Sequence, residues 1–187
     1  MRKLDRRTIA ALATAAAMAL AAEAQAADAL TFGTNWKAQA EHGGFYQAVA
    51  TGLYRDKGLD VTIRQGGPQV NHAQLLAAGR VDLNMGGNLF GQFNFTQNKV
   101  PVVTIAAIFQ KEPQVLLAHP DVKSFEDLRG KTLFIGNDGQ LTFWLWMKQQ
   151  FGFTNEQVKP YTFNPAPFLA DKNSAQQGYV TSEPFAI

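Results

Sequence analysis

The stretch that decides the fold is LTFGTNWKAQAEHGGFYQAVATGLYRDKGLDVTIRQGG, residues 30–67. It begins with a short β-type run over 30–34, continues through a polar loop that ends in two glycines, and predicts a helix over 43–54. A second β-type run follows over 59–65. A strand, a helix and another strand in this order are typical of a parallel βαβ unit.

The predicted helix carries a regular apolar pattern. Phe45, Val49 and Leu53 recur at a spacing of four residues. This spacing brings their side chains to one face of a helix, and we expect that face to be buried.

The strand–turn–helix pattern repeats along the rest of the chain. Strands are predicted over 81–85, 100–110, 114–119, 132–136, 158–164 and 178–184, with 100–110 as a long buried strand. Helices are predicted over 66–79, 89–98 and 140–152 and within 165–172, with a turn over 137–139. A second structural unit is expected to begin near Lys111. The alternation predicts an α/β fold with mainly parallel sheets flanked by helices.

The first 26 residues have the pattern of an export signal: a basic start, an apolar core and a small-residue cleavage site at Ala24-Gln25-Ala26. Its removal takes away four of the 17 basic and two of the 15 acidic residues, which leaves equal numbers of each. No basic stripe remains to indicate nucleic-acid binding. We therefore expect a soluble exported protein, periplasmic in a Gram-negative host, and Arg6-Arg7 leaves the general and twin-arginine routes open. The chain stops in the apolar run VTSEPFAI, which favours a C-terminally truncated fragment.

Common catalytic and metal-binding patterns are absent from the sequence. Cysteine does not occur, which excludes a disulfide scaffold, a thiolate metal site and a cysteine nucleophile. There is no G-x-S-x-G elbow, P-loop, G-x-G-x-x-G or H-E-x-x-H. His42, His72 and His119 lie in different segments, and His72 is expected on a helix surface. The sequence therefore predicts no catalytic residue, no metal and no cofactor.

Turns that follow a strand and precede a helix carry the candidate ligand-binding residues. In an open α/β sheet such turns lie at the carboxyl ends of the strands, where ligands bind. Helix starts there offer free N–H groups, and glycine permits close approach. The candidates are Asn35, Trp36, His42, Gly43, Gly86, Gly87, Asn88, Asp138 and Gly139. Structural roles are the alternative: Trp36 as a cover for the core, His42 as a brace, Asp138 as a turn or cap residue.

Four segments together resemble a known family: 35–63, LLAAGRVDLNMGG (75–87), FEDLRGKTLFIG (125–136) and YVTSEP (179–184). They are similar to the periplasmic substrate-binding proteins of ABC importers, in the group that includes alkanesulfonate, nitrate/taurine and thiamine-pyrimidine-precursor binders. The resemblance implies the two-lobed periplasmic-binding-protein fold of type II, with a small-molecule solute clamped between the lobes.

Lobe 1 would span 27–110 and lobe 2 would span 111–187. The resemblance also implies a monomer that docks on an ABC permease at the membrane. Glu183-Pro184 matches the pair that marks the return to the hinge in this family, and Glu183 joins the candidate ligand-binding residues.

The same superfamily contains an enzyme, the eukaryotic thiamine-pyrimidine synthase. The resemblance places its cofactor-bearing lysine on Gly86 and its histidine on Phe90, and its cysteine-rich loop has no counterpart in this chain. The resemblance therefore does not extend to the catalytic residues, and we expect a binding protein without enzyme activity.

The candidate loops favour a nitrogen-containing ligand. They carry Glu41, Asp138 and Glu183, with Lys37 as the only nearby cation. Carboxylates accept hydrogen bonds from a ring N–H or an amine, and Trp36 offers a flat wall. A thiamine-type pyrimidine precursor is the first choice. An alkanesulfonate, taurine or nitrate binder, a synthase-like enzyme and a sensor domain are the alternatives.

Overall fold

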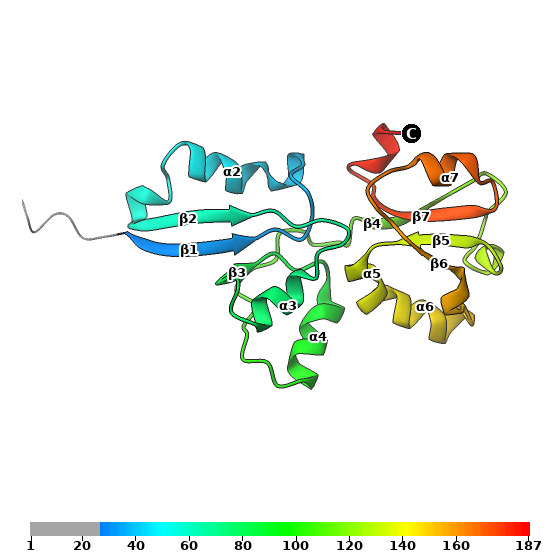
Figure 1. Cartoon of the computed structure of the whole chain (residues 1–187), viewed down its shortest axis with the longest axis horizontal. Helices are drawn as coiled ribbons and strands as arrows, with labels where there is room; N and C mark the ends of the chain where they lie inside the picture. Colours follow the sequence, from blue (N-terminus) through cyan, green and yellow to red (C-terminus); the bar gives the residue numbers. More distant parts are fainter. Residues whose placement is uncertain (1–26) are drawn as a thin grey trace, which may run out of the picture.

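The computed structural model describes residues 27–187, and the predicted signal peptide lies outside them. Figure 1 shows two sheets side by side, each with helices packed on it. One sheet is built from residues 28–97, here called the N-terminal half, and the other from residues 112–187, the C-terminal half. The arrangement is an α/β fold with sheets dominated by parallel pairs, as the sequence predicts.

The sheet of the N-terminal half has three parallel strands. β1 (Asp28–Gly33) lies between β2 (Leu59–Arg64) and β3 (Leu83–Asn84). Figure 1 shows α2 on one side of this sheet and α3 and α4 on the other. The helical segments are η1 (Ala40–His42), α2 (Gly43–Ala50), η2 (Arg55–Lys57), α3 (His72–Ala77) and α4 (Leu89–Gln97). The predicted strand–helix–strand unit is confirmed.

The sheet of the C-terminal half has four strands in the order β4-β7-β5-β6. The strands are β4 (Gln114–Ala118), β5 (Thr132–Ile135), β6 (Val158–Pro160) and β7 (Ser174–Tyr179). β5 is parallel to both neighbours, whereas the edge strand β4 is antiparallel to β7. The helical segments are η3 (Glu126–Leu128), α5 (Asn137–Leu141), α6 (Phe143–Phe151), η4 (Asn155–Gln157), α7 (Ala166–Ala170) and η5 (Glu183–Phe185).

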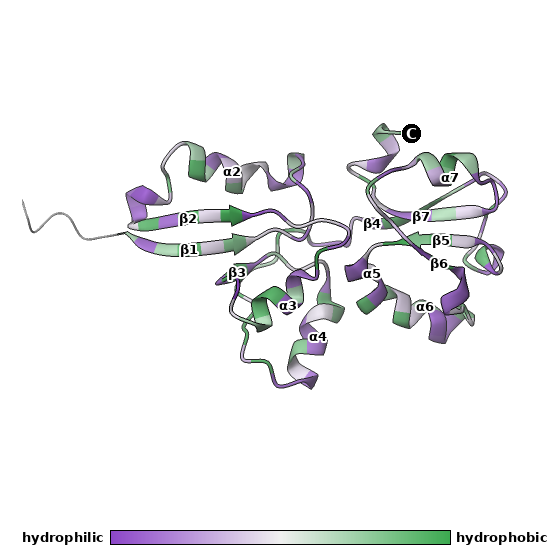
Figure 2. Ribbon diagram, in the orientation of Figure 1, coloured by the Kyte–Doolittle hydropathy of each residue, from purple (hydrophilic) through white to green (hydrophobic). Residues whose placement is uncertain are grey.

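A cluster of buried apolar side chains lies in the C-terminal half. Leu133 and Ile135 of β5 are fully buried and pack against Trp144 and Met147 of α6. Figure 2 shows the green of apolar residues along part of β5. Trp146 lies two residues from Trp144, on the opposite face of α6, and is 40% exposed.

The prediction of a long buried strand over 100–110 is wrong. This run forms no strand, and Val103 and Ile105 are 84% and 77% exposed. A strand needs a neighbour to take up its backbone hydrogen bonds. Within residues 27–187 no strand pairs with this run, and its apolar character alone does not supply that partner.

The buried face predicted for the first helix is also wrong in part. α2 ends at Ala50, because Gly52 adopts the left-handed conformation (φ +81°) and breaks the helix before Leu53. Leu53 is 57% and Val49 41% exposed. Phe45 does pack on the sheet, with its ring centroid 4.7 Å from that of Phe32.

Further boundaries differ from the prediction: α3 begins at His72 rather than at 66, and β6 ends at Pro160 rather than at 164. The predicted turn over 137–139 belongs to helix α5, and the predicted helix over 140–152 is divided at Thr142, which has φ −123° and ψ −101°. β7 begins at Ser174, four residues before the predicted 178. The prediction missed this start because the sequence SAQQGY lacks the apolar residues that mark a buried strand. No helix in residues 27–187 is long and apolar enough to span a membrane.

Candidate functional site

The loops at the carboxyl ends of the parallel strands in both halves meet at one interface. In the N-terminal half these loops are 34–37 after β1, 65–70 after β2 and 85–88 after β3. In the C-terminal half the corresponding segments are 136–138 after β5, which includes the start of α5, the loop 161–163 after β6, and 180–183 after β7, which ends at the first residue of η5. This is the edge of an open α/β sheet at which ligands bind. The interface therefore holds the candidate site.

Hydrogen bonds join the halves directly. The backbone N–H of Asn137 donates to the carbonyl of Pro68 at 2.8 Å, and its side-chain amide donates to the carbonyl of Gln69 at 3.0 Å. The Gln69 amide in turn donates to the carbonyl of Tyr161 at 2.9 Å. The loop after β2 is thus fixed against the loops after β5 and β6.

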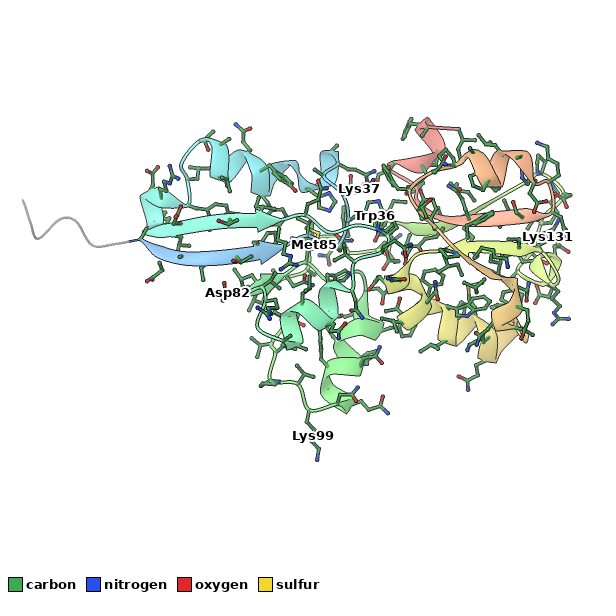
Figure 3. The ribbon with its side chains drawn as sticks, viewed as in Figure 1. Trp36, Lys37, Asp82, Met85, Lys99 and Lys131 are labelled. Atoms are coloured by element: carbon green, nitrogen blue, oxygen red, sulfur yellow. The ribbon has the colours of Figure 1, made fainter. Side chains whose placement is uncertain are left out.

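Trp36 lies at the centre of an aromatic cluster between the halves (Figure 3). Its ring stacks on Tyr161, with centroids 5.9 Å apart and planes 17° apart. Phe163 and Tyr179 approach it at 6.0 and 6.2 Å. Trp36 is only 3% exposed, and its indole N–H has no hydrogen-bond partner within residues 27–187. We call these four residues the aromatic cluster.

His42 braces the loop that carries Trp36. Its Nδ1 accepts a hydrogen bond from the Gln39 backbone N–H at 3.3 Å, so Nε2 carries the proton and donates to the Asn35 Oδ1 at 3.1 Å. The Asn35 amide then donates to the Tyr179 hydroxyl at 3.1 Å, across the interface. Burial lowers the pKa of His42, although the charge of nearby Glu41 opposes the shift. A neutral His42 therefore positions Asn35.

A second cluster joins α3 to α5. His72 Nε2 lies 3.2 Å from Asp138 Oδ1, and the Asn84 amide donates to His72 Nδ1 at 3.1 Å. The prediction of His72 on a helix surface is wrong, because His72 is the first residue of α3 and is only 3% exposed. The Asn71 side chain caps this helix start by accepting from the Gln74 N–H.

A small pocket lies beside the His72–Asp138 pair. Gly86, Gly87, Asn88 and Asp138 line it together with His72. A Cβ added at Gly87 would meet the Asp138 carboxylate, with Cγ at 3.3 Å, so glycine allows this close approach. The cavity volume is about 20 Å³, which is room for about one water molecule.

Acidic residues lie close to the tyrosines of the interface. Glu183 is 4% exposed, and its carboxylate accepts from the Tyr161 hydroxyl at 3.0 Å and the Tyr179 N–H at 2.7 Å. Burial raises the pKa of Tyr179, and the charges of Glu112, Asp138 and Glu183 raise it further. Burial and Glu183 likewise raise the pKa of Tyr161.

The remaining candidate residues have different surroundings. Asn88 caps α4 by accepting from the Phe90 N–H at 3.1 Å, and its amide reaches the Thr142 hydroxyl at 3.4 Å. Gly43 lies exposed at the start of α2, with open space where a Cβ would stand. Gly139 is buried in α5, where a Cβ would meet the Phe143 ring at 2.6 Å.

The sequence reasoning missed several residues of the interface. Tyr161, Phe163, Tyr179 and the His72 ring all take part in contacts between the halves. Their positions at the ends of strands could have identified the two tyrosines, because Tyr161 follows β6 directly and Tyr179 is the last residue of β7. Within residues 27–187, no group of three or more His, Cys, Asp or Glu residues could hold a metal ion.

Comparison with known proteins agrees with this architecture. A search of curated proteins gives no match. The family model described as NMT1/THI5 like matches residues 39–186. This family covers the alkanesulfonate, nitrate/taurine and thiamine-precursor binding group, and it suggests a solute-binding function. Because the match covers most of the chain, the chain belongs to the NMT1/THI5-like family. The matched residues include loops from both halves that meet at the interface.

Proposed function

We propose that this protein is the extracytoplasmic solute-binding component of an ABC importer. The two halves act as two lobes that close on a small nitrogen-containing solute, with a thiamine-type pyrimidine precursor as the first choice. The protein is exported to the periplasm, works as a monomer, carries out no chemistry, and docks on a membrane permease when closed.

The observation that carries this proposal is the meeting of six strand-end loops at one interface. Three loops come from each sheet, and the interface contains a central aromatic cluster. Ligand sites of α/β sheets lie at these strand ends, and aromatic side chains are common walls of small-molecule pockets.

A closing motion is supported by the tightness of the interface. The pocket beside Asp138 has a volume of about 20 Å³, whereas small-molecule sites enclose roughly 300–1,000 Å³. A solute therefore needs the halves to separate before it enters. The hydrogen bonds from Asn35 to Tyr179 and from Asn137 to Pro68 are the contacts that such a motion breaks.

The absence of chemistry is supported by the residues at the synthase positions. Gly86 and Phe90 stand where the resemblance places the lysine and histidine of the thiamine-pyrimidine synthase. Neither glycine nor phenylalanine has a group that reacts with a cofactor or transfers a proton.

The proposed function is tested by thermal-shift measurements on the mature protein. The panel contains aminopyrimidines, thiamine, taurine, alkanesulfonates and nitrate. A ligand at a hundredfold excess over its Kd stabilises by about 2.7 kcal/mol, which for a chain of this size raises Tm by roughly 5–10 °C. We expect such a shift with an aminopyrimidine.

Two tryptophan variants locate the binding site. Trp36→Phe changes a ring of the aromatic cluster and should reduce the shift. Trp146→Phe changes an exposed ring on α6 and should leave it unchanged. A shift with sulfonates or nitrate alone would refute the pyrimidine choice and leave solute binding in place. No shift with any compound would contradict the proposed function.

A further inference from the structure

Lys37 places a positive charge on the aromatic cluster. Its Nζ lies 4.8 Å from the centroid of the Phe163 ring, within the distance at which an ammonium is attracted to the face of an aromatic ring. Within residues 27–187 no carboxylate is close enough to Lys37 to form an ion pair. Figure 3 shows Lys37 and Trp36 together in the region between the halves. The ring is therefore the identified partner of this ammonium.

The surroundings of the cluster favour a cation. The buried carboxylate of Glu183 lies at the cluster, where it accepts from the Tyr161 hydroxyl at 3.0 Å and from the Tyr179 N–H at 2.7 Å. The charges of Glu112, Asp138 and Glu183 also contribute to the raised pKa of Tyr179. A positive group placed here is attracted by these carboxylates and by the ring faces, whereas an anion is repelled by the same carboxylates.

Two features of the cluster are unusual for a purely structural core. Phe163 has φ +63°, which is an outlier for a residue with a large side chain. Such conformations gather at ligand sites, where the surroundings hold them. The buried indole N–H of Trp36 has no partner in residues 27–187, although buried tryptophans usually find one. A solute with a hydrogen-bond acceptor would satisfy it.

We propose that the Lys37 ammonium occupies the place of a positive charge carried by the solute, and that Lys37 thereby sets the selectivity of the site for organic cations. This inference rests on the proposed function, because it concerns the solute that the two halves enclose. When the solute enters, its charged group replaces the Lys37 ammonium on the Phe163 ring, and the lysine swings outward toward solvent. The acceptor of the solute meets the Trp36 N–H.

The test compares two solutes that differ mainly in charge. They are 4-amino-5-aminomethyl-2-methylpyrimidine, whose amine is protonated at neutral pH, and 4-amino-5-hydroxymethyl-2-methylpyrimidine, which carries a neutral hydroxyl there. Ethanesulfonate serves as an anion. Isothermal titration calorimetry gives the Kd of each for the mature wild-type protein and three variants. The quantity of interest is the ratio of the Kd of the alcohol to that of the amine.

We expect wild-type protein to bind the amine about tenfold more tightly than the alcohol. Lys37→Met removes the competing charge and should raise this preference by about fivefold. Phe163→Leu removes the ring face and should lower it. Lys57→Met removes an exposed lysine of η2 and should leave it unchanged, which controls for net charge.

Each alternative outcome is distinct. A Kd ratio that Lys37→Met leaves unchanged or lowers, with both pyrimidines still bound, overturns the role of Lys37 and leaves the proposed function standing. Binding of ethanesulfonate alone, lost in Lys37→Met, assigns Lys37 to an anion and overturns the inference in favour of a sulfonate binder. Failure of all three compounds to bind counts against the inference and the proposed function together.

Discussion

Gly66 is the residue at which a single methyl group should do most damage to the candidate site. It is buried in the loop after β2, directly against the loop that leads to Trp36. A Cβ added at Gly66 would meet the Thr34 carbonyl oxygen and would lie 2.8 Å from the Asn35 carbonyl carbon. These are backbone atoms, which cannot turn aside as the end of a side chain can. The Gly66→Ala substitution must therefore push the two loops apart.

The expected cost follows from the contacts that are lost. Overpacking a buried position costs about 1–3 kcal/mol, and the rigid neighbours place Gly66→Ala near the upper end. The Gly66 N–H also donates to the Thr34 hydroxyl at 3.1 Å, and losing this bond adds roughly 0.5–1.5 kcal/mol. We expect a loss of about 3–4 kcal/mol in the free energy of unfolding, or roughly 6–16 °C in Tm.

The neighbouring glycine is the matched control. A Cβ at Gly67 would find only the Lys37 side chain, with Cγ at an ordinary 3.7 Å. Gly67→Ala should change stability by less than about 1 kcal/mol, because it mainly reduces the freedom of the unfolded chain. Urea unfolding of both variants, followed by tryptophan fluorescence, checks the difference. Equal stabilities for Gly66→Ala and Gly67→Ala would refute the steric argument.

Three further predictions use stability as the readout. Glu183→Leu should cost about 2–4 kcal/mol in urea unfolding, because it orphans the Tyr161 hydroxyl and one backbone N–H; Glu183→Gln should cost much less, and equal losses would contradict this. The lowered pKa of His42 means that the unfolded state takes up a proton first as pH falls below about 6.5. Stability should therefore be full above that pH and drop by up to about 2 kcal/mol near pH 5, with a smaller drop in His42→Gln; an unchanged drop would exclude His42 as the source. Gly139→Ala should lower the free energy of unfolding by about 1–3 kcal/mol, measured by calorimetry, because the added methyl group meets buried neighbours. Gly43→Ala, at an exposed position, should leave the free energy of unfolding unchanged. Similar Tm values for the two variants would show that α5 tolerates the methyl group.

Local signals predicted most elements of the fold correctly. The βαβ unit over β1, α2 and β2 follows from apolar runs divided by glycines, and α4 begins at Leu89, directly after the cap residue Asn88, as the turn before it predicts. These features depend on residues that lie close together in sequence: a cap contacts the first turn, and a strand or helix has its own period. The loops at strand ends could be named for the same reason.

Features that need a distant partner were not predictable. The run 100–110 has the composition of a buried strand but pairs with nothing in residues 27–187. β7 shows the reverse case, because its polar sequence SAQQGY gives little strand signal, yet it lies fully buried between β4 and β5. In both segments the neighbours decide the structure, and a periodicity argument does not contain the neighbours.

The candidate site shows the same limit more sharply. The strand-end rule identified Trp36 in the first sheet and Asp138 in the second, but it does not say which residues of the two sheets face each other. The Asn35–Tyr179 hydrogen bond joins residues 144 positions apart, and no local pattern specifies that contact. The rule becomes stronger when it is applied equally to both sheets. Tyr161 follows β6 as Trp36 follows β1, so an aromatic residue just beyond a parallel strand in either sheet should count as a candidate wall of a shared site.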